Sequence, residues 1–156
     1  YLDEVDGVML TNGPGNPKHL ESLSQRVRAI LSRGIPTFGI CLGHQILARA
    51  AGADTYKLKY GHRSQNQPVI ESSSQRSFIT SQNHGYAVSD ELPNDWEVWF
   101  KNLNDGTNSG IRHKYRPFLS VQFHPEAAAG PRDTAFLFDD FLRMVGDLRS
   151  TRAERV

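Results

Sequence analysis

The chain has 156 residues with one cysteine, 38% hydrophobic residues and a formal charge of +1 from 18 basic and 17 acidic side chains. This length suits a single globular domain, and a lone cysteine rules out an internal disulfide and favours a reducing compartment, which we take to be the cytoplasm or, alternatively, the mitochondrial matrix. The scattered basic residues, the lack of Cys and His at zinc spacing and the lack of a long apolar run argue against nucleic acid, metal and membrane as partners.

The first half of the chain alternates short apolar strands with helices. Strands are expected at 7–11 and 36–40, each bounded by turn-forming residues, and amphipathic helices at 19–33 and 43–51. A glycine follows each helix and acts as its stop signal. The order strand, helix, strand, helix predicts a parallel α/β sheet.

The second half is expected to form further strands and a closing helix. Five short segments between Gly, Asn and Ser turns have strand character, at 55–60, 68–70, 77–80, 97–101 and 118–123. An apolar stripe opposed by charged residues then predicts a helix that packs on the sheet, and it is formed by Leu137, Phe138, Phe141, Leu142, Val145 and Leu148. We expect one domain over 1–149, followed by a polar tail or linker at 150–156.

Cys41 lies where the second strand turns into the second helix, with Gly39 and Gly43 two residues to either side. This pattern is typical of a nucleophile elbow, in which the glycines allow a tight turn and the helix N-terminus favours thiolate over thiol. The alternative is a small side chain of the hydrophobic core, the commoner role of a lone cysteine after an apolar strand.

His124 and Glu126 supply the two groups that a thiolate nucleophile requires, an imidazole to move protons and a carboxylate to orient it. They follow an apolar strand and are two residues apart, so extended geometry would point both side chains to the same side, with Pro125 ending the strand. A surface turn is the alternative. Together with the elbow, this motif predicts a triad of Cys41, His124 and Glu126.

The loop at 11–17 reads TNGPGNP, and it offers isolated backbone N–H groups because its two prolines have none to donate. From residue 13 to residue 17 only Gly13, Gly15 and Asn16 have an N–H, and such a group is suited to bind an oxyanion together with the N–H of Leu42, the residue after the nucleophile. An ordinary strand-to-helix turn is the alternative. A phosphate loop is excluded, because the pattern GxxxxGK[ST] is absent.

Five segments resemble, in this order, the glutamine amidotransferase domain of carbamoyl phosphate synthetase: TNGPGNP, FGICLGHQ, TSQNHGYAV, NDGTNSGI and SVQFHPEAAAGP. The combination of GxCxGHQ with a later HPE marks triad-type, class I glutamine amidotransferases. GPGNP and QNHGYAV are closer to the carbamoyl phosphate branch than to the anthranilate or GMP branches. The resemblance implies a flavodoxin-like glutaminase domain, with a mostly parallel central sheet flanked by helices.

The activity implied by this resemblance is hydrolysis of L-glutamine to glutamate and ammonia through a thioester on Cys41. Ammonia would pass to a carbamoyl phosphate synthetase large subunit or a fused synthetase domain, where ATP and magnesium would act, and no cofactor is expected in this domain. The alternatives are a glutaminase domain of the anthranilate, aminodeoxychorismate or GMP synthase type, a non-catalytic regulatory or structural homologue, and another Cys–His hydrolase such as a peptidase.

The resemblance also implies that the N–H groups of Gly13 and Leu42 hold the oxyanion, and it assigns a substrate pocket. Matching motif positions would hold glutamine through side-chain amides and backbone groups, at Gly13, Gly15, Leu42, Gln45, Asn83, Gly85 and Tyr86. From the residues alone, Gln45 fits a helix surface equally well and QNHG fits a polar turn.

The other histidines receive no catalytic role. We assign His44 and His84 to structure, because one triad needs one imidazole, and we expect His19, His62 and His113 to lie in solvent.

Two features depart from the family pattern. The family's domain normally begins with an earlier strand, helix and strand, so the resemblance implies that this chain is truncated at its N-terminus. In the segment GHRSQNQP, Ser64 stands where the family has a glycine.

Overall fold

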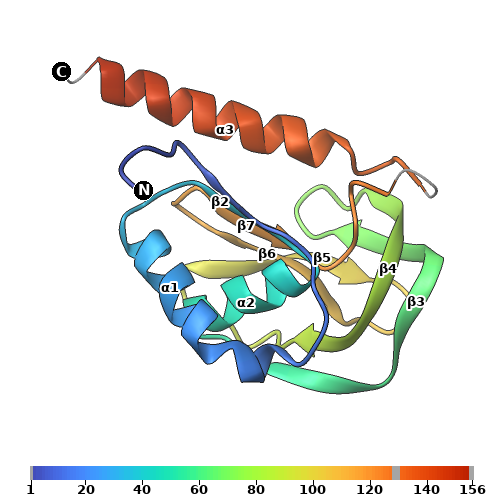
Figure 1. Cartoon of the computed structure of the whole chain (residues 1–156). Helices are drawn as coiled ribbons and strands as arrows, with labels where there is room; N and C mark the ends of the chain where they lie inside the picture. Colours follow the sequence, from blue (N-terminus) through green and yellow to red (C-terminus); the bar gives the residue numbers. More distant parts are fainter. Residues whose placement is uncertain (1, 128–130, 155–156) are drawn as a thin grey trace.

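A seven-stranded sheet organises the computed structural model, which describes residues 2–127 and 131–154 (Figure 1). Its strands in chain order are β1 (Val8–Leu10), β2 (Thr37–Ile40), β3 (Thr55–Glu71), β4 (Ser77–Val88), β5 (Trp96–Asn102), β6 (Asn108–His113) and β7 (Phe118–Val121). In space the order is β1-β2-β7-β6-β4-β3-β5, and β5 also pairs with β6.

The sheet is parallel at one end only. β1 pairs with β2 and β2 with β7 in parallel, whereas every other pairing is antiparallel. The additional pairing of β5 with β6 closes β3, β4, β5 and β6 into a barrel-like ring. The α/β class is therefore confirmed, but the expectation of a mostly parallel sheet is wrong, because short turns in the middle of the chain join strands as antiparallel neighbours.

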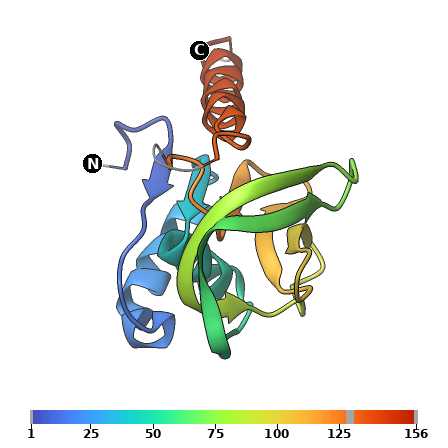
Figure 2. The ribbon, with the colours of Figure 1, turned by 90° about the vertical axis from the view of Figure 1, so that its right-hand side faces the viewer.

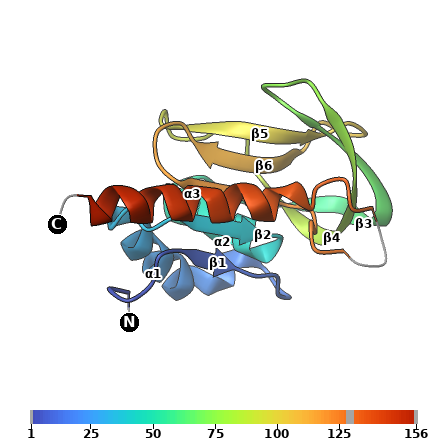
Figure 3. The same cartoon turned by 90° about the horizontal axis from the view of Figure 1, so that it is seen from above.

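Helices cover both faces of the sheet (Figure 2). The short helix η1 (Pro17–Leu20), α1 (Glu21–Ser32) and α2 (Leu42–Ala51) lie on one face, and α3 (Phe136–Ala153) lies on the other, over β2 (Figure 3). The expected helices are thus present, and the domain boundary expected after 149 falls inside α3. None of the helices among the described residues has the length and apolar character needed to span a membrane.

The strands of the middle segment are longer than their sequence suggests. β3 continues through GHRSQNQP with two irregularities in its register, so the strands expected at 55–60 and 68–70 are one. β4 includes QNHG, which is therefore not a turn, and β6 was not expected at all. Polar side chains that face a cavity hide the alternation by which such strands are usually recognised.

Ser64 lies within β3, opposite Gln82 of β4. Its backbone is not in the left-handed region that favours glycine, which in this segment is occupied by Gly61, with φ of 72°. Serine in place of the family's glycine therefore imposes no backbone strain.

Two apolar clusters form the core, one on each face of the sheet. On one face the fully buried Phe38 of β2 packs against Phe138 and Phe141 of α3, with ring centroids 6.0 and 5.6 Å apart. On the other face, Leu47 of α2 and Ile111 of β6 are completely buried. Each such side chain contributes about 1.5–3 kcal/mol by leaving water, so the sheet is held between α2 and α3.

Helix α2 begins in very close contact with β1. A Cβ on Gly43 would lie 2.0 Å from the carbonyl oxygen of Leu10, and a Cβ on Gly39 would lie 2.6 Å from the carbonyl oxygen of Gly43. Only glycine fits at these two positions, and their fit sets the angle at which α2 leaves β2.

The substitution Gly43→Ala tests this packing. The added methyl group cannot fit without moving β1 or α2, so we expect the free energy of unfolding to fall by about 1–3 kcal/mol or more. Gly146→Ala is the matched control, because Gly146 is also helical but a Cβ there would have nothing within 4 Å; it should be neutral or stabilising by up to about 1 kcal/mol. Urea unfolding of the chain measures both, and equal effects would contradict the packing argument.

Candidate active site

Cys41 occupies the sharp turn between β2 and α2. Its φ of 55° and ψ of −108° are strained for a residue with a side chain, and its N–H donates to the carbonyl oxygen of Val121 at 2.9 Å, which ties the turn to β7. The residue is 5% exposed. Strain of this kind at a lone cysteine before a helix N-terminus is what a nucleophile elbow requires.

His124 and Glu126 lie just beyond the end of β7. Nδ1 of His124 bonds Oε1 of Glu126 at 2.7 Å, and the N–H of His124 donates to the carbonyl oxygen of Ser81 on β4. The two side chains meet because the backbone turns here, with the N–H of Ala127 directed to the carbonyl oxygen of His124. The extended geometry expected for this motif is therefore wrong, although the contact it was meant to explain is present.

The electrostatics of the site favour a positively charged His124. Its pKa is raised from 6.5 to about 10, first by hydrogen bonding to the adjacent Cys41 side chain and then by Glu126, against the opposing effect of burial. Partial burial would raise the pKa of Glu126, but the bond from His124 lowers it on balance. His124 and Glu126 therefore form one charged unit, with the Cys41 side chain next to the imidazole, in the order that a triad requires.

Two backbone N–H groups of the cavity that Cys41 lines have no acceptor among the described residues. Neither Gly13 nor Leu42 has an acceptor for its N–H in the part of the chain that the structure describes, and both residues line the same cavity as Cys41. A Cβ on Gly13 would lie 3.0 Å from the Leu42 side chain. Leu42 is the first residue of α2, so its N–H also carries the positive end of the helix dipole.

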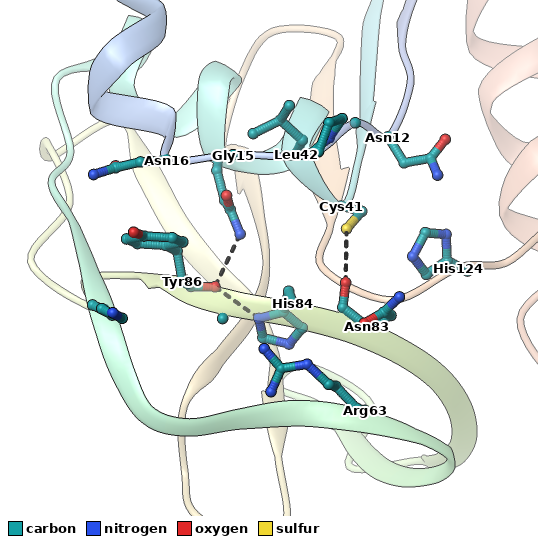
Figure 4. Close-up of a pocket in the computed structure, with 15 residues that line it drawn as sticks. Asn12, Gly15, Asn16, Cys41, Leu42, Arg63, Asn83, His84, Tyr86 and His124 are labelled. Carbon is teal, nitrogen blue, oxygen red and sulfur yellow. Dashed lines mark hydrogen bonds between the residues drawn. The ribbon is translucent and has the colours of Figure 1, made fainter.

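These groups surround one cavity of about 600 Å³ (Figure 4). All of the expected substrate residues line it, and Glu126 lies behind His124. The cavity is also lined by residues that the sequence had not singled out for the site, namely Asn12, Pro14, Asn16, Lys57, Arg63 and His84. What these residues share is their place in the fold. They follow β1 or lie on β3 and β4, and the pairing of β3 with β4 could not be predicted from the sequence.

Gln45 points inward from α2 and is 3% exposed, so it is not a helix-surface residue. Its Nε2 donates to the carbonyl oxygen of Tyr86 at 2.9 Å and to Oε1 of Gln122 at 3.0 Å. With both of its N–H groups in use, its Oε1 is the atom left to accept from a ligand. Gln122 was missed, although it and Ser120 are alternate polar residues in an apolar strand, which is the signal of side chains directed at a partner.

Strand β4 presents its backbone to the same cavity. The carbonyl oxygen of Asn83 lies 3.8 Å from Sγ of Cys41, as an acceptor for the thiol, and that of Tyr86 holds Gln45 (Figure 4). The segment 83–86 therefore forms the wall that faces the nucleophile and the helix.

The structure corrects part of the assignment of the other histidines. His44 is fully buried, bonds Ser120 Oγ at 2.8 Å, and has its pKa lowered to about 3 by burial, as fits a structural residue. His84 is also buried. His62, expected in solvent, is 8% exposed and bonded to His84, and His113 is half-buried against Trp96, whereas His19 is exposed.

Sequence comparison finds a matching family and several relatives of this chain. Residues 1–144 match the family described as class-I glutamine amidotransferase. The arginine-specific small chain of carbamoyl phosphate synthase from Aspergillus clavatus is 51% identical over 95% of this chain and 33% of its own length. The multifunctional protein URA2 of Saccharomyces cerevisiae is 51% identical over 96% of this chain and 7% of its own length. The chain thus spans about a third of the small-chain relatives.

Solved structures have the same fold. A putative GMP synthase component from Thermoplasma acidophilum superposes with a TM-score of 0.83 at 23% identity, covering 97% of this chain and 78% of the other. A glutamine amidotransferase from Thermotoga maritima gives 0.71 at 25% identity, covering 96% and 67%.

The raised pKa of His124 predicts a pH-dependent stability. The folded chain holds this proton between pH 6.5 and about 10 and the unfolded chain releases it, so the stabilisation is complete below 6.5 and is lost as the pH rises through about 10. In urea unfolding, the free energy of unfolding of the wild type should exceed that of His124→Gln by an amount that decreases across that interval.

His113→Gln is the matched control for this measurement. Burial lowers the pKa of His113, so its effect has the opposite sign: the wild type loses stability relative to the variant as the pH falls below 6.5. If the free energy of unfolding of the wild type exceeds that of His124→Gln by the same amount from pH 6.5 to 10, the charged unit is contradicted.

Proposed function

The chain belongs to the class-I glutamine amidotransferase family, and on that premise we propose that it hydrolyses the side-chain amide of glutamine to glutamate and ammonia. The observation that carries the proposal is that Cys41, His124, Gly13 and Leu42 line one and the same cavity, in which the N–H groups of Gly13 and Leu42 have no acceptor among the described residues. A nucleophile, a proton carrier and an oxyanion site are the three parts that acyl transfer from an amide requires.

The reaction proceeds in two halves. Sγ of Cys41 attacks the amide carbon, and the two backbone N–H groups bind the oxyanion, each typically contributing about 10²- to 10³-fold in rate. His124, whose Nδ1 is held by Glu126, gives a proton from Nε2 to the departing ammonia and leaves a thioester. It then takes a proton from water, which attacks the thioester and releases glutamate and the thiol.

The relatives support a partner that uses the ammonia. The small chain of carbamoyl phosphate synthase and two multifunctional fungal proteins, URA2 and pyr-3, match at 51–53% identity, with the latter two covered over only 7–8% of their length. We therefore assign the chain to the glutaminase part of carbamoyl phosphate synthesis, in which a separate or fused synthetase, with its ATP and magnesium, receives the ammonia. Because arginine-specific and multifunctional relatives match equally well, the proposal concerns the chemistry that they share.

The charge of the cavity suits an amino-acid substrate. Its lining residues in the described part of the chain include the cations Lys57 and Arg63 and no carboxylate. Both cations are exposed, and Arg63 donates to the carbonyl oxygen of Tyr60. They can attract the α-carboxylate of glutamine while its side chain extends toward Cys41.

Cys41→Ser tests the proposed chemistry. In the full-length enzyme, glutamine-dependent release of ammonia should fall by at least about 10³-fold, because the hydroxyl is a far weaker nucleophile here. Synthesis supported by added ammonia should persist and is the control for folding. Undiminished release from glutamine would refute the proposal, and absence of labelling of wild-type Cys41 by a glutamine-analogue alkylating agent would favour a non-catalytic homologue.

Arg63→Gln tests the role of the cations. Loss of an exposed charge near the α-carboxylate should raise the KM for glutamine about three- to tenfold, with little change in kcat. Arg76→Gln is the control, since Arg76 is an exposed arginine that lies over the ring of Phe78 and does not line the cavity. Steady-state kinetics compare the two, and an equal KM for both variants would count against a role for Arg63.

A further inference from the structure

A chain of hydrogen bonds links the turn between β5 and β6 to the pocket strand β4. Nε2 of His62 donates to Oδ2 of Asp105 at 2.7 Å, and Nδ1 of His62 lies 3.1 Å from Nε2 of His84. Nδ1 of His84 donates to the carbonyl oxygen of Tyr86 at 2.7 Å. The two histidines are direct partners in the register of β3 and β4. We call Asp105, His62 and His84 the relay.

Both carboxylate oxygens of Asp105 are committed. Oδ1 accepts from the N–H and the hydroxyl of Thr107 at 3.0 and 2.8 Å, which leaves Oδ2 for His62. Partial burial would raise the pKa of Asp105, but the bonds from Thr107 and His62 lower it on balance. The relay therefore starts from an ionised carboxylate held in one orientation.

The neighbouring side chains determine how many protons the two rings need. The hydroxyl of Thr80 donates to a main-chain carbonyl and so accepts from Nε2 of Gln82, which turns Oε1 of Gln82 toward Nε2 of His84 at 2.8 Å. Three acceptors thus surround the rings: the Tyr86 carbonyl, Gln82 Oε1 and the Asp105 carboxylate. All of these hydrogen bonds can be made only when the two rings carry three N–H groups between them. Two neutral rings carry two, so the third N–H gives the pair one positive charge.

Burial opposes this extra proton. His84 is 7% exposed, and burial lowers its pKa to about 4. The hydrogen bond to the Tyr86 carbonyl and the charge of Asp105 act in the opposite direction, but burial outweighs them. An asparagine at 105 that kept the bonds to Thr107 would turn its NH₂ group toward His62, force Nε2 of that ring to accept, and so move the ring's own N–H to Nδ1, which faces His84.

The relay ends on the wall of the pocket. The carbonyl oxygen of Tyr86 accepts from His84 and from Nε2 of Gln45, and the carbonyl of Asn83 on the same strand faces Sγ of Cys41 (Figure 4). A shift of His84 therefore displaces the segment that faces both Gln45 and the nucleophile. Displacements of about 1 Å in such walls can change rates or affinities by up to about 10²-fold.

We infer that Asp105 and His62, which lie outside the cavity lining around Cys41, are positioning residues for the glutamine pocket: acting through His84, they hold the segment 83–86 against α2. This inference rests on the proposed glutaminase function. In this view the ring formed by β3, β4, β5 and β6 determines the affinity for glutamine, and the residues around Cys41 carry out the chemical step.

Two variants of the full-length enzyme test the relay by the split between KM and kcat. Asp105→Asn, which reverses the bond to His62, should raise the KM for glutamine on the order of tenfold and leave kcat within about twofold. Asp90→Asn is the control, because Asp90 is a carboxylate of the same chain that pairs with Lys101 away from the relay. An unchanged KM for Asp105→Asn would overturn the inference. This holds even if the variant unfolds at a lower temperature, because a loss of stability alone does not show that Asp105 positions the pocket.

Substitution of His62 supplies an independent test. A glutamine at 62 offers one N–H donor to Asp105 and one acceptor to His84, whereas a leucine offers neither. We therefore expect His62→Gln to keep the KM within about threefold of wild type and His62→Leu to raise it on the order of tenfold. Equal KM values for the two variants would show that only the volume at 62 matters, and would overturn the inference.

The outcomes separate this inference from the function on which it rests. Loss of glutamine hydrolysis in Cys41→Ser together with unchanged KM values in the relay variants would refute the relay alone. Undiminished hydrolysis in Cys41→Ser would refute the proposed function itself.

Discussion

The close approach of α2 to β1 determines where the reactive groups lie. Because the Leu10 carbonyl occupies the space that a side chain on Gly43 would need, the chain must pass from β2 into α2 within one residue. Cys41 makes that passage, with a φ of 55°. The same turn places Leu42 directly after Cys41, and the loop at Gly13 lines the same cavity, so the proposed nucleophile and the proposed oxyanion site depend on one steric constraint.

The site forms where two kinds of sheet meet. The parallel strands β1, β2 and β7 supply the elbow, the glycine loop and the residues after β7, whereas the antiparallel ring supplies the facing wall through β4. β7 belongs to both parts, since it pairs with β2 on one side and β6 on the other. In the proposed reaction, Cys41 and His124 make the bond and move the protons, whereas the ring contributes carbonyl groups and cations.

How much of this could be predicted follows from the range of the interactions. The elbow, the contact of His124 with Glu126 and the ends of the first two helices depend on neighbours within a few residues, and these were predicted, whereas the last helix runs past the boundary expected after 149. The ring depends on pairings between distant segments, and its polar side chains do not alternate with apolar ones, so β6 and the continuity of β3 were missed. For the same reason His62 was placed in solvent: its partners, His84 and Asp105, come from strands and turns that no local pattern joins.

The position of β7 between β2 and β6 also has a kinetic consequence. β2 pairs with β7 across roughly 80 residues of sequence, so this contact carries a large loop-closure cost and belongs to the slow part of folding. Until β7 is inserted, Cys41 lacks the acceptor that fixes its N–H, and His124 lies far from the sulfur along the chain. A chain in which β7 has not docked therefore has an ordinary cysteine, and the proposed pair of Cys41 and His124 forms only when β7 lies between β2 and β6.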